Sequence, residues 1–468
     1  MIGSLKGHTA FRGDAVNKRV VSSLVLPIFL LGLLAGCGCS GEASKTDDLT
    51  ARAKELVESL AAGDFSTPVE SFDDTMKGAL PADKLEEAWE SLVAAAGPFE
   101  KQAGTRTDTV GRYDVVYVTC EFEKSSFDLK VVFNDQKEIS GLFFVPSQGS
   151  AEYEAPSYVD PDSFTEKEVT VGAGEWALPG TLTVPEGDGP FPAVVLVHGS
   201  GPNDRDETIG PSKPFRDLAW GLATRGIAVL RYEKRTLEHQ VKLAEEYSGL
   251  TINEETIDDA LAAASLLRDT EGIDAGSVFM LGHSLGGTVI PRIAALDPGI
   301  KGLIILAGAA RPLEDLLLEQ TSYIISLDGT VSEDEKAQLE QLEAQVAKVK
   351  DPNLSESTPA AELPPGIPAE YWLDLRGYDP PEVAKSIDRP VLILQGERDY
   401  QVTMADYGRW EEALASRNNV TLITYPDLNH LFIEGEGKST PSEYETAGHV
   451  SEAVIDDIAG FVKGPRSP

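Results

Sequence analysis

The chain carries a serine between two glycines at the point where an apolar segment gives way to a helical pattern. Residues Val278 to Leu281 are continuously apolar, and Gly282-His283-Ser284-Leu285-Gly286 follows them directly. After this pentapeptide, apolar residues recur at helical spacing, at Val289, Ile290 and Ile293. A G-x-S-x-G sequence between a buried strand and a helix predicts a sharp turn that lifts the serine hydroxyl above a sheet. Side chains at Gly282 and Gly286 would collide with the strand and helix, so we expect both positions to require glycine.

From about residue 165 onward, strand-like and helical segments alternate. The strand-like segments are rich in apolar residues and lie at 180–184, 193–197, 227–231, 278–281, 303–306, 391–394 and 420–425. Several are continuous apolar runs, which is typical of parallel strands buried on both faces. The alternation predicts an α/β domain with a doubly wound, mostly parallel sheet over residues 165–465.

A serine hydroxyl is a weak nucleophile at neutral pH, so Ser284 needs a base to take its proton. We expect this base to be His430, which lies in a loop after the strand-like segment 420–425, and His449 is the rival candidate. The other four histidines are given different places. His8 lies in the leader, and His198 is assigned a structural role. His239 lies in a polar surface segment, and His283 lies in the turn beside the serine.

An orienting carboxylate should precede the histidine and follow another strand. Asp399 fits, because it comes shortly after the segment 391–394. Glu397 is the second candidate, whereas Asp388 lies at the wrong end of that strand. The chain order serine, acid, histidine is the order expected of a serine hydrolase on this kind of sheet.

Hydrogen-bond donors are also expected for an oxyanion. One should be the backbone N–H of Leu285, the residue after the nucleophile. The second should come from the small-residue loop His198-Gly199-Ser200-Gly201, most simply from Ser200 or Gly201. The loss of one such donor typically costs about 3–4 kcal/mol of transition-state stabilisation.

Longer stretches of the chain resemble a known family, the bacterial α/β-hydrolase esterases of the EstD type. The resemblance spans about residues 165–465 and is carried by His198 to Thr208, Gly210-Pro211, Lys213 to Phe215, Ala219 to Leu222 and Gly226 to Tyr232. It implies carboxylesterase activity on short-chain acyl esters through an acyl-enzyme, without metal or cofactor. The family's triad roles carry onto Ser284, Asp399 and His430.

The polar run Asp204 to Glu207 either shapes a substrate pocket or forms a salt-bridged loop, and the second interpretation is favoured. An amidase or peptidase could use the same triad, and a ligand-binding lipoprotein without activity is a further alternative. Lys and Arg together number 40 against 77 Asp and Glu, a net charge of −37, which argues against nucleic-acid binding.

Residues 311–381 contain no strand candidate. Ser332 with Glu335 resembles a capping box at the start of a charged helix, whose apolar residues recur at spacings of three and four. We predict a helical cap insertion here, with a simple surface decoration as the alternative.

The N-terminus resembles a bacterial lipoprotein signal. Lys18 and Arg19 precede an apolar run that ends in Leu34-Ala35-Gly36-Cys37, which is similar to a lipobox. We therefore predict a signal peptide at 1–36, lipidation of Cys37, a tether at 37–48 and an extracytoplasmic protein anchored to the cell membrane. Plain secretion and an uncleaved anchor are the alternatives. Cys39 and Cys120 show no metal-ligand spacing and are interpreted as two ordinary thiols, although a disulfide between them is possible.

Between tether and sheet, helical patterns give way to period-two segments at 113–118, 127–133 and 139–145. This order predicts a small α+β domain at 49–147. It is similar to nuclear-transport-factor-like domains that precede hydrolases in some bacterial lipoproteins, and we expect it to act as a spacer or accessory-binding module.

Overall fold

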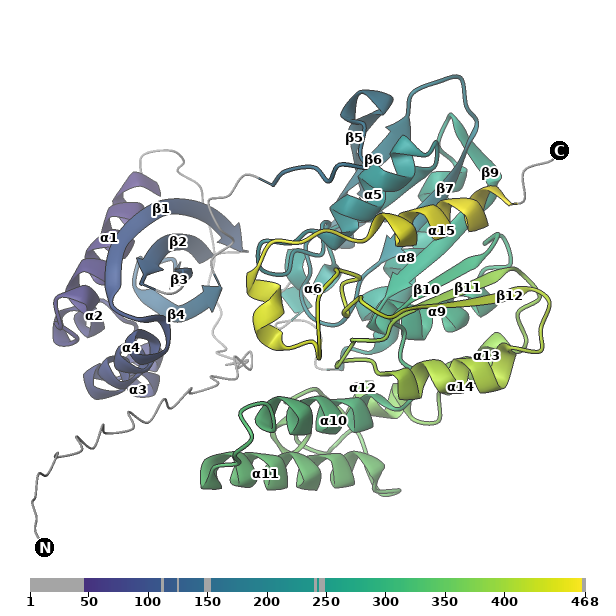
Figure 1. Ribbon diagram of the computed structural model, residues 1–468. Coiled ribbons are helices and arrows are strands. Elements are labelled where there is room, and N and C mark those ends of the chain that lie inside the picture. Colours follow the sequence, from purple (N-terminus) through teal and green to yellow (C-terminus); the bar gives the residue numbers. More distant parts are fainter. Residues whose placement is uncertain are drawn as a thin grey trace, which may run out of the picture.

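A computed structural model describes residues 46–464 except 111–112, 124–125, 147–152, 240–241 and 244–248. Its strands form a four-stranded and an eight-stranded sheet (Figure 1). The predicted signal peptide, the lipidation site Cys37, Cys39 and most of the tether lie outside the described residues.

The N-terminal part is a small domain of helices followed by an antiparallel sheet. Its elements are α1 (Thr46–Ala61), α2 (Ser66–Glu70), α3 (Asp74–Ala79), α4 (Ala82–Ala96), β1 (Phe99–Val110), β2 (Tyr113–Phe122), β3 (Ser126–Phe133) and β4 (Ile139–Pro146). The strands pair in chain order, and the helices contribute Leu56 and Trp89 to a core shared with the sheet. The three predicted strands are confirmed.

Strand β1 was not predicted. Its sequence, FEKQAGTRTDTV, contains few apolar residues because it is an edge strand that pairs only with β2. Backbone hydrogen bonds hold such a strand in place, and they leave no alternating apolar pattern in the sequence.

The second part of the chain forms a mostly parallel sheet. Its strands are β5 (Phe164–Val171), β6 (Leu178–Pro185), β7 (Phe191–Val197), β8 (Ala228–Tyr232), β9 (Ile273–His283), β10 (Leu303–Leu306), β11 (Val391–Gly396) and β12 (Val420–Tyr425). They are ordered β12-β11-β10-β9-β7-β8-β6-β5. The antiparallel pairs in this sheet are β5 with β6 and β6 with β8, and the other neighbouring strands are parallel. The seven predicted strands and the mostly parallel sheet are confirmed, and β5, an edge strand with charged residues, is an addition.

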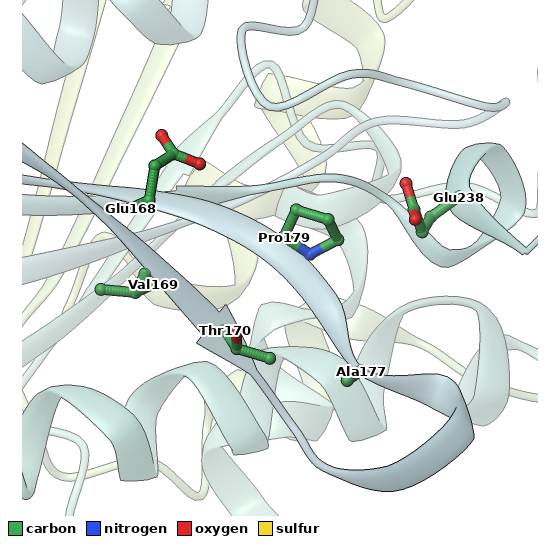
Figure 2. Close-up of a pocket in the computed structure, with 6 residues that line it drawn as sticks. All are labelled: Glu168, Val169, Thr170, Ala177, Pro179 and Glu238. Atoms are coloured by element: carbon green, nitrogen blue, oxygen red, sulfur yellow. The ribbon is translucent and has the colours of Figure 1, made fainter. Parts of the chain in front are cut away.

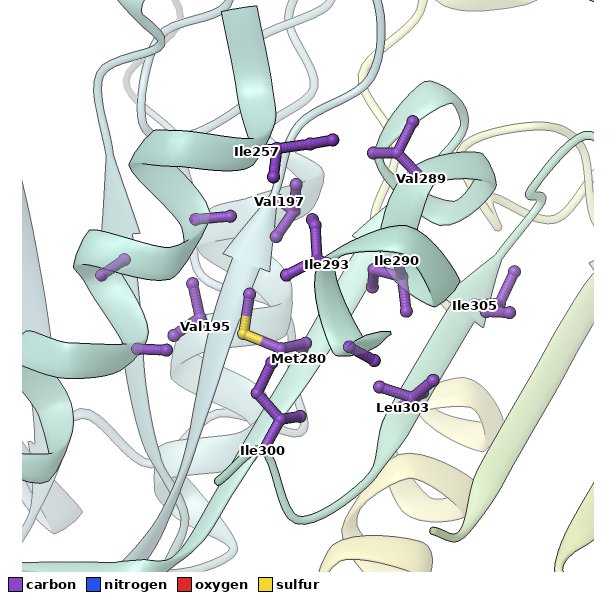
Figure 3. Packing of buried hydrophobic residues seen from close by; sticks show 14 of the residues in the cluster. Val195, Val197, Ile257, Met280, Val289, Ile290, Ile293, Ile300, Leu303 and Ile305 are labelled. Atoms are coloured by element: carbon purple, nitrogen blue, oxygen red, sulfur yellow. The ribbon is translucent and has the colours of Figure 1, made fainter. Parts of the chain in front are cut away.

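Helices cover both faces of this sheet. They are α5 (Pro214–Thr224), α6 (Arg235–Glu238), α8 (Asp258–Arg268), α9 (Leu285–Leu296), α14 (Met404–Leu414) and α15 (Glu452–Lys463), with short turns η1 (Pro161–Ser163), η2 (Gly174–Trp176), η3 (Asn253–Ile257, a π-helix) and η5 (Pro441–Glu445). One core joins α8, α9 and α14 to the sheet, and the other joins α5 and α15 to its opposite face. Figure 3 shows the part of the first core in which Val289, Ile290 and Ile293 of α9 pack against the strands. Strand β9 contributes Met280 to the first core and Leu281 to the second.

Residues 311–381 are helical, and no strand occurs among them. They contain α10 (Leu313–Ile325), α11 (Glu333–Lys350), η4 (Ala360–Glu362) and α12 (Ala369–Leu375), and α13 (Pro380–Ala384) begins at their end. The capping box at the start of α11 is confirmed, because Ser332 and Glu335 exchange side-chain and backbone hydrogen bonds. In Figure 1, α10 and α11 lie side by side.

Helix α9 offers a matched test of the core beneath the serine. The side chain of Ile293 is fully buried, whereas Leu296 on the same helix is 59% exposed. We expect Ile293→Ala to lower the free energy of unfolding by about 2–5 kcal/mol, because it leaves a cavity. Leu296→Ala should change it by less than about 0.5 kcal/mol. Denaturant unfolding followed by near-UV circular dichroism measures both, and equal losses would contradict this assignment of the core.

Candidate active site

Ser284 sits on a strained turn between β9 and α9. Its φ of 54° and ψ of −119° are unusual for a residue other than glycine. A Cβ at Gly282 would lie 2.3 Å from the Gly286 carbonyl carbon, and one at Gly286 would lie 2.2 Å from the Val197 carbonyl oxygen. Both glycines therefore allow backbones to approach where no side chain fits, as the sequence predicted.

The structure brings the predicted base and acid together. Nδ1 of His430 lies 2.7 Å from Oδ2 of Asp399, and both side chains are buried. The other carboxylate oxygen, Oδ1, accepts the backbone N–H groups of Gln401 and Val402 at 2.7 and 3.0 Å. Asp399 is therefore held by its own loop while it faces the imidazole, as a group that orients a base must be.

The rival candidates lie elsewhere. His449 is 37% exposed and its Nδ1 is 3.1 Å from Asp217. The exposed Glu397 accepts a hydrogen bond from the hydroxyl of Thr424. Asp388 is fully exposed, at the opposite end of β11, and is paired with an arginine. None of these three contacts His430 through the interactions described.

In the predicted oxyanion loop, the backbone carbonyl groups accept hydrogen bonds from one side chain, that of Asn203. Nδ2 of Asn203 donates to the carbonyl oxygens of Gly199, Ser200 and Gly201 at 3.2, 3.1 and 3.4 Å. In a trans peptide the N–H of the next residue points opposite to the carbonyl. The N–H groups of Ser200 and Gly201 therefore point away from Asn203.

The position of Leu285 is compatible with the predicted role of its backbone N–H as a donor. Leu285 is the first residue of α9, and the first N–H groups of a helix have no carbonyl partner in a preceding turn. Gly199 lies directly beside the nucleophile, since a Cβ built on it would be 3.1 Å from the Cβ of Ser284. The loop and the helix start thus border the same serine.

Two further buried side chains, Glu207 and His283, lie next to this site. The sequence did not predict a role for either of them there. Glu207, in the loop after β7, accepts the N–H of Gly199 at 2.7 Å and lies 2.8 Å from Nδ1 of His283. Nε2 of His283 is 2.9 Å from the backbone carbonyl oxygen of His430. The sequence offered only proximity to Ser284 as a signal for His283, and none that separated Glu207 from its acidic neighbours.

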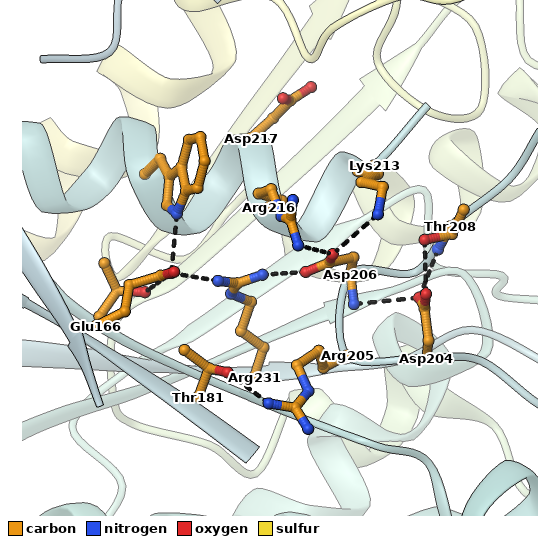
Figure 4. Close-up of polar contacts among 12 residues, drawn as sticks. Glu166, Thr181, Asp204, Arg205, Asp206, Thr208, Lys213, Arg216, Asp217 and Arg231 are labelled. Atoms are coloured by element: carbon orange, nitrogen blue, oxygen red, sulfur yellow. Dashed lines mark hydrogen bonds and ion pairs between the residues drawn. The ribbon is translucent and has the colours of Figure 1, made fainter. Parts of the chain in front are cut away.

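Arg205 and Asp206 of the polar run form ion pairs, which confirms the salt-bridged interpretation for these two residues. Asp206 pairs with the buried Arg231 of β8 and with Arg216 of α5 (Figure 4). Arg205 pairs with Glu233, which follows β8, at 2.6 Å. The loop is thereby fastened to β8 and α5.

A shallow hollow of about 400 Å³ lies between β5, β6 and α6 (Figure 2). It is lined by Glu168, Val169, Thr170, Ala177, Pro179 and Glu238. None of these residues belongs to the loops that carry the predicted triad. Within the described ranges, no group of three or more His, Cys, Asp or Glu side chains is arranged to hold a metal ion.

Family models match both parts of the chain. Residues 53–142 match a family described as a protein of unknown function, DUF3887, and residues 194–445 match the alpha/beta hydrolase family. The match at 53–142 is compatible with the predicted nuclear-transport-factor-like domain.

Individual proteins are also similar. Esterase EstD of Thermotoga maritima is 41% identical over 412 residues, which cover 87% of this chain and 93% of that protein. Monoacylglycerol lipase of Mycolicibacterium smegmatis is 28% identical over 39% of this chain and 61% of its own length. Among solved structures, Est1E of Butyrivibrio proteoclasticus aligns with a TM-score of 0.41 and 17% identity, over 64% of this chain and 99% of that one. By its matched family model and its identity to Esterase EstD, the chain belongs to the alpha/beta hydrolase family.

Proposed function

We propose that this hydrolase is a carboxylesterase in which Ser284 is the nucleophile, His430 the general base and Asp399 the residue that orients it. The contact between His430 and Asp399 at 2.7 Å carries the proposal, because it singles out one histidine and one carboxylate. The identity to Esterase EstD over most of the chain supports carboxylesterase activity. Short-chain acyl esters are the proposed substrates.

The reaction follows from these roles. His430 takes the hydroxyl proton as Ser284 Oγ attacks the ester carbonyl, and the backbone N–H of Leu285 with that of Ser200 or Gly201 binds the oxyanion. Collapse releases the alcohol, which receives the proton from His430, and leaves an acyl-serine. Water then attacks the acyl-serine with His430 again as base, and the carboxylic acid and free serine result.

The helices of residues 311–381 are proposed as a cap over this site. Helix α10 contacts the loop that carries Asp399: Nε2 of Gln320 donates to the carbonyl of Gln401 at 2.9 Å. The rings of Tyr323 and Tyr400 stack with centroids 5.2 Å apart. These contacts place α10 beside the acid loop, where a cap can limit the size of the ester that enters.

Single substitutions test the triad. Ser284→Ala should lower kcat for p-nitrophenyl butyrate by roughly 10⁶-fold, and His430→Ala should come close to that loss. His449→Ala should leave kcat unchanged, because His449 is paired with Asp217. Circular dichroism verifies that each variant is folded, and undiminished turnover in folded Ser284→Ala would refute the proposal.

The leaving group distinguishes an esterase from an amidase or peptidase on the same triad. We expect turnover of p-nitrophenyl acetate and butyrate and far slower cleavage of aminoacyl-nitroanilides. Both release a chromophore, so steady-state rates compare directly. Cleavage of the anilides alone would overturn the ester assignment.

We also propose that the protein is extracytoplasmic and anchored to the cell membrane by lipid on Cys37. The sequence Leu34-Ala35-Gly36-Cys37 supports this proposal. In the described part of the chain, no helix is both long and apolar enough to cross a membrane.

The anchor can be tested by fractionation. Cys37→Ala should move the protein from the membrane to the soluble fraction, because the thiol that carries the lipid is absent. An immunoblot of both fractions, with wild type in parallel, measures the shift. Membrane retention of the variant would show that the lipobox interpretation is wrong.

A further inference from the structure

Glu207 is a buried carboxylate whose position is unusual. It is 1% exposed and adopts φ of +50°, a conformation that few residues other than glycine accept. Its two oxygens face different loops: Oε1 accepts the N–H of Gly199 at 2.7 Å, and Oε2 lies 2.8 Å from Nδ1 of His283. The backbone strain at Glu207 is therefore accompanied by contacts to two segments that border Ser284.

His283 faces an acceptor at each ring nitrogen. Nε2 lies 2.9 Å from the carbonyl oxygen of His430, and a carbonyl oxygen can only accept a hydrogen bond. Nδ1 faces Glu207, which already accepts the N–H of Gly199 and is thus favoured as a carboxylate. Both nitrogens must then donate, and only an imidazolium has two N–H groups.

We propose that Glu207 and His283 form a buried ion pair that positions the three catalytic loops relative to one another. The pair links the oxyanion loop after β7 through Gly199, the nucleophile turn after β9 through His283, and the base loop after β12 through the carbonyl of His430. Both members are positioning residues, since neither is assigned a contact with substrate. This inference rests on the proposed function of Ser284 and His430.

The oxyanion loop depends on such contacts. The N–H of Gly199 is held by Glu207, and its carbonyl oxygen is held by Nζ of the buried Lys234 at 2.7 Å. The rings of His283 and His430 also lie against each other, with centroids 4.7 Å apart and planes tilted by 46°. Loss of the pair would release one side of Gly199 and the backbone of His430 at the same time.

The surrounding charges favour the ionised pair. Burial lowers the pKa of His283, but the charge and hydrogen bond of Glu207, with Asp399 and the His430 carbonyl, raise it above its usual value overall. Burial raises the pKa of Glu207, but His283 and His198 and the Gly199 N–H lower it overall. Burial and the Lys234 charge hold the pKa of His198 near 4, so this ring is neutral.

These directions set the pH range in which the pair exists. Because the pKa of His283 is raised in the folded protein, the stabilisation that the ion pair contributes is fully present below about pH 6.5, the ordinary histidine pKa. This stabilisation is lost as the pH rises through the pKa of His283 in the folded protein. The lowered Glu207 pKa means that protonation of this carboxyl disrupts the pair only below the usual titration range of a glutamate. The observable limb is therefore alkaline.

Glu207→Gln removes the negative charge of the pair but can keep its hydrogen bonds. A glutamine can accept the Gly199 N–H with its carbonyl oxygen and donate its amide to Nδ1 of a neutral His283, whose Nε2–H still donates to His430. Glu207→Ala removes both contacts. Asp259→Asn is the matched control, because Asp259 is also buried and is paired with Arg235, and its hydrogen bonds in the described part of the chain do not reach the three loops.

The experiment is the pH dependence of kcat and KM for p-nitrophenyl butyrate, with Ser284→Ala as the blank for spontaneous hydrolysis. We expect wild type and Asp259→Asn to lose kcat on an alkaline limb, and Glu207→Gln to lack that limb. Glu207→Ala should lose about 10²-fold in kcat at every pH with KM little changed, as expected for displaced catalytic groups. Glu207→Gln should retain at least about tenfold more activity than Glu207→Ala.

The outcomes are separable. An alkaline limb in Glu207→Gln that matches wild type, or its absence from Asp259→Asn, overturns the ion-pair inference while the triad proposal stands. If Glu207→Ala does not fold, the comparison of Glu207→Gln with wild type still decides. Turnover by Ser284→Ala instead overturns the triad itself, whatever the Glu207 variants do.

Discussion

The close approach of β7, β9 and α9 at the turn that carries Ser284 is the constraint on which the rest of the candidate site depends. A Cβ at Gly286 would lie 2.2 Å from the Val197 oxygen, so α9 begins almost in contact with the end of β7. This proximity forces the unusual backbone of Ser284 and sets the loop after β7 against it. Because β9 lies between β7 and β10, the serine stands at the centre of the sheet's carboxyl edge.

The parts of this arrangement that local pattern encodes could be predicted from the sequence. Strands buried on both faces appear as apolar runs, and the residues just after them must lie at the carboxyl edge. This rule selected Asp399 and His430 from among many acids and six histidines, and the structure places the two in contact. Strands β1 and β5 were not predicted, because both are edge strands that are held by backbone hydrogen bonds. Such pairing leaves little trace in the pattern of apolar side chains along the sequence.

The position of Glu207 could not be predicted from local sequence pattern. In the sequence it is one of four consecutive charged residues, Asp204 to Glu207, and nothing local distinguishes it from Asp206. A positive φ turns Glu207 inward to His283, whereas Asp206 faces Arg231. That difference is set by the tertiary fold, since the partners come from β9 and β8, far away along the chain.

Charged groups gather around the predicted oxyanion loop for a physical reason. A loop of Gly199, Ser200 and Gly201 lets backbone approach the serine, but it has almost no apolar side chain with which to pack. Its position must therefore come from hydrogen bonds to its peptide groups, and buried donors and acceptors are costly unless paired. Lys234 is paired with Glu255, and Glu207 with His283, so both charged groups that bind the peptide groups of Gly199 have a partner of opposite charge. Such pairs add little net stability, but they specify one loop position, which is what an oxyanion site needs.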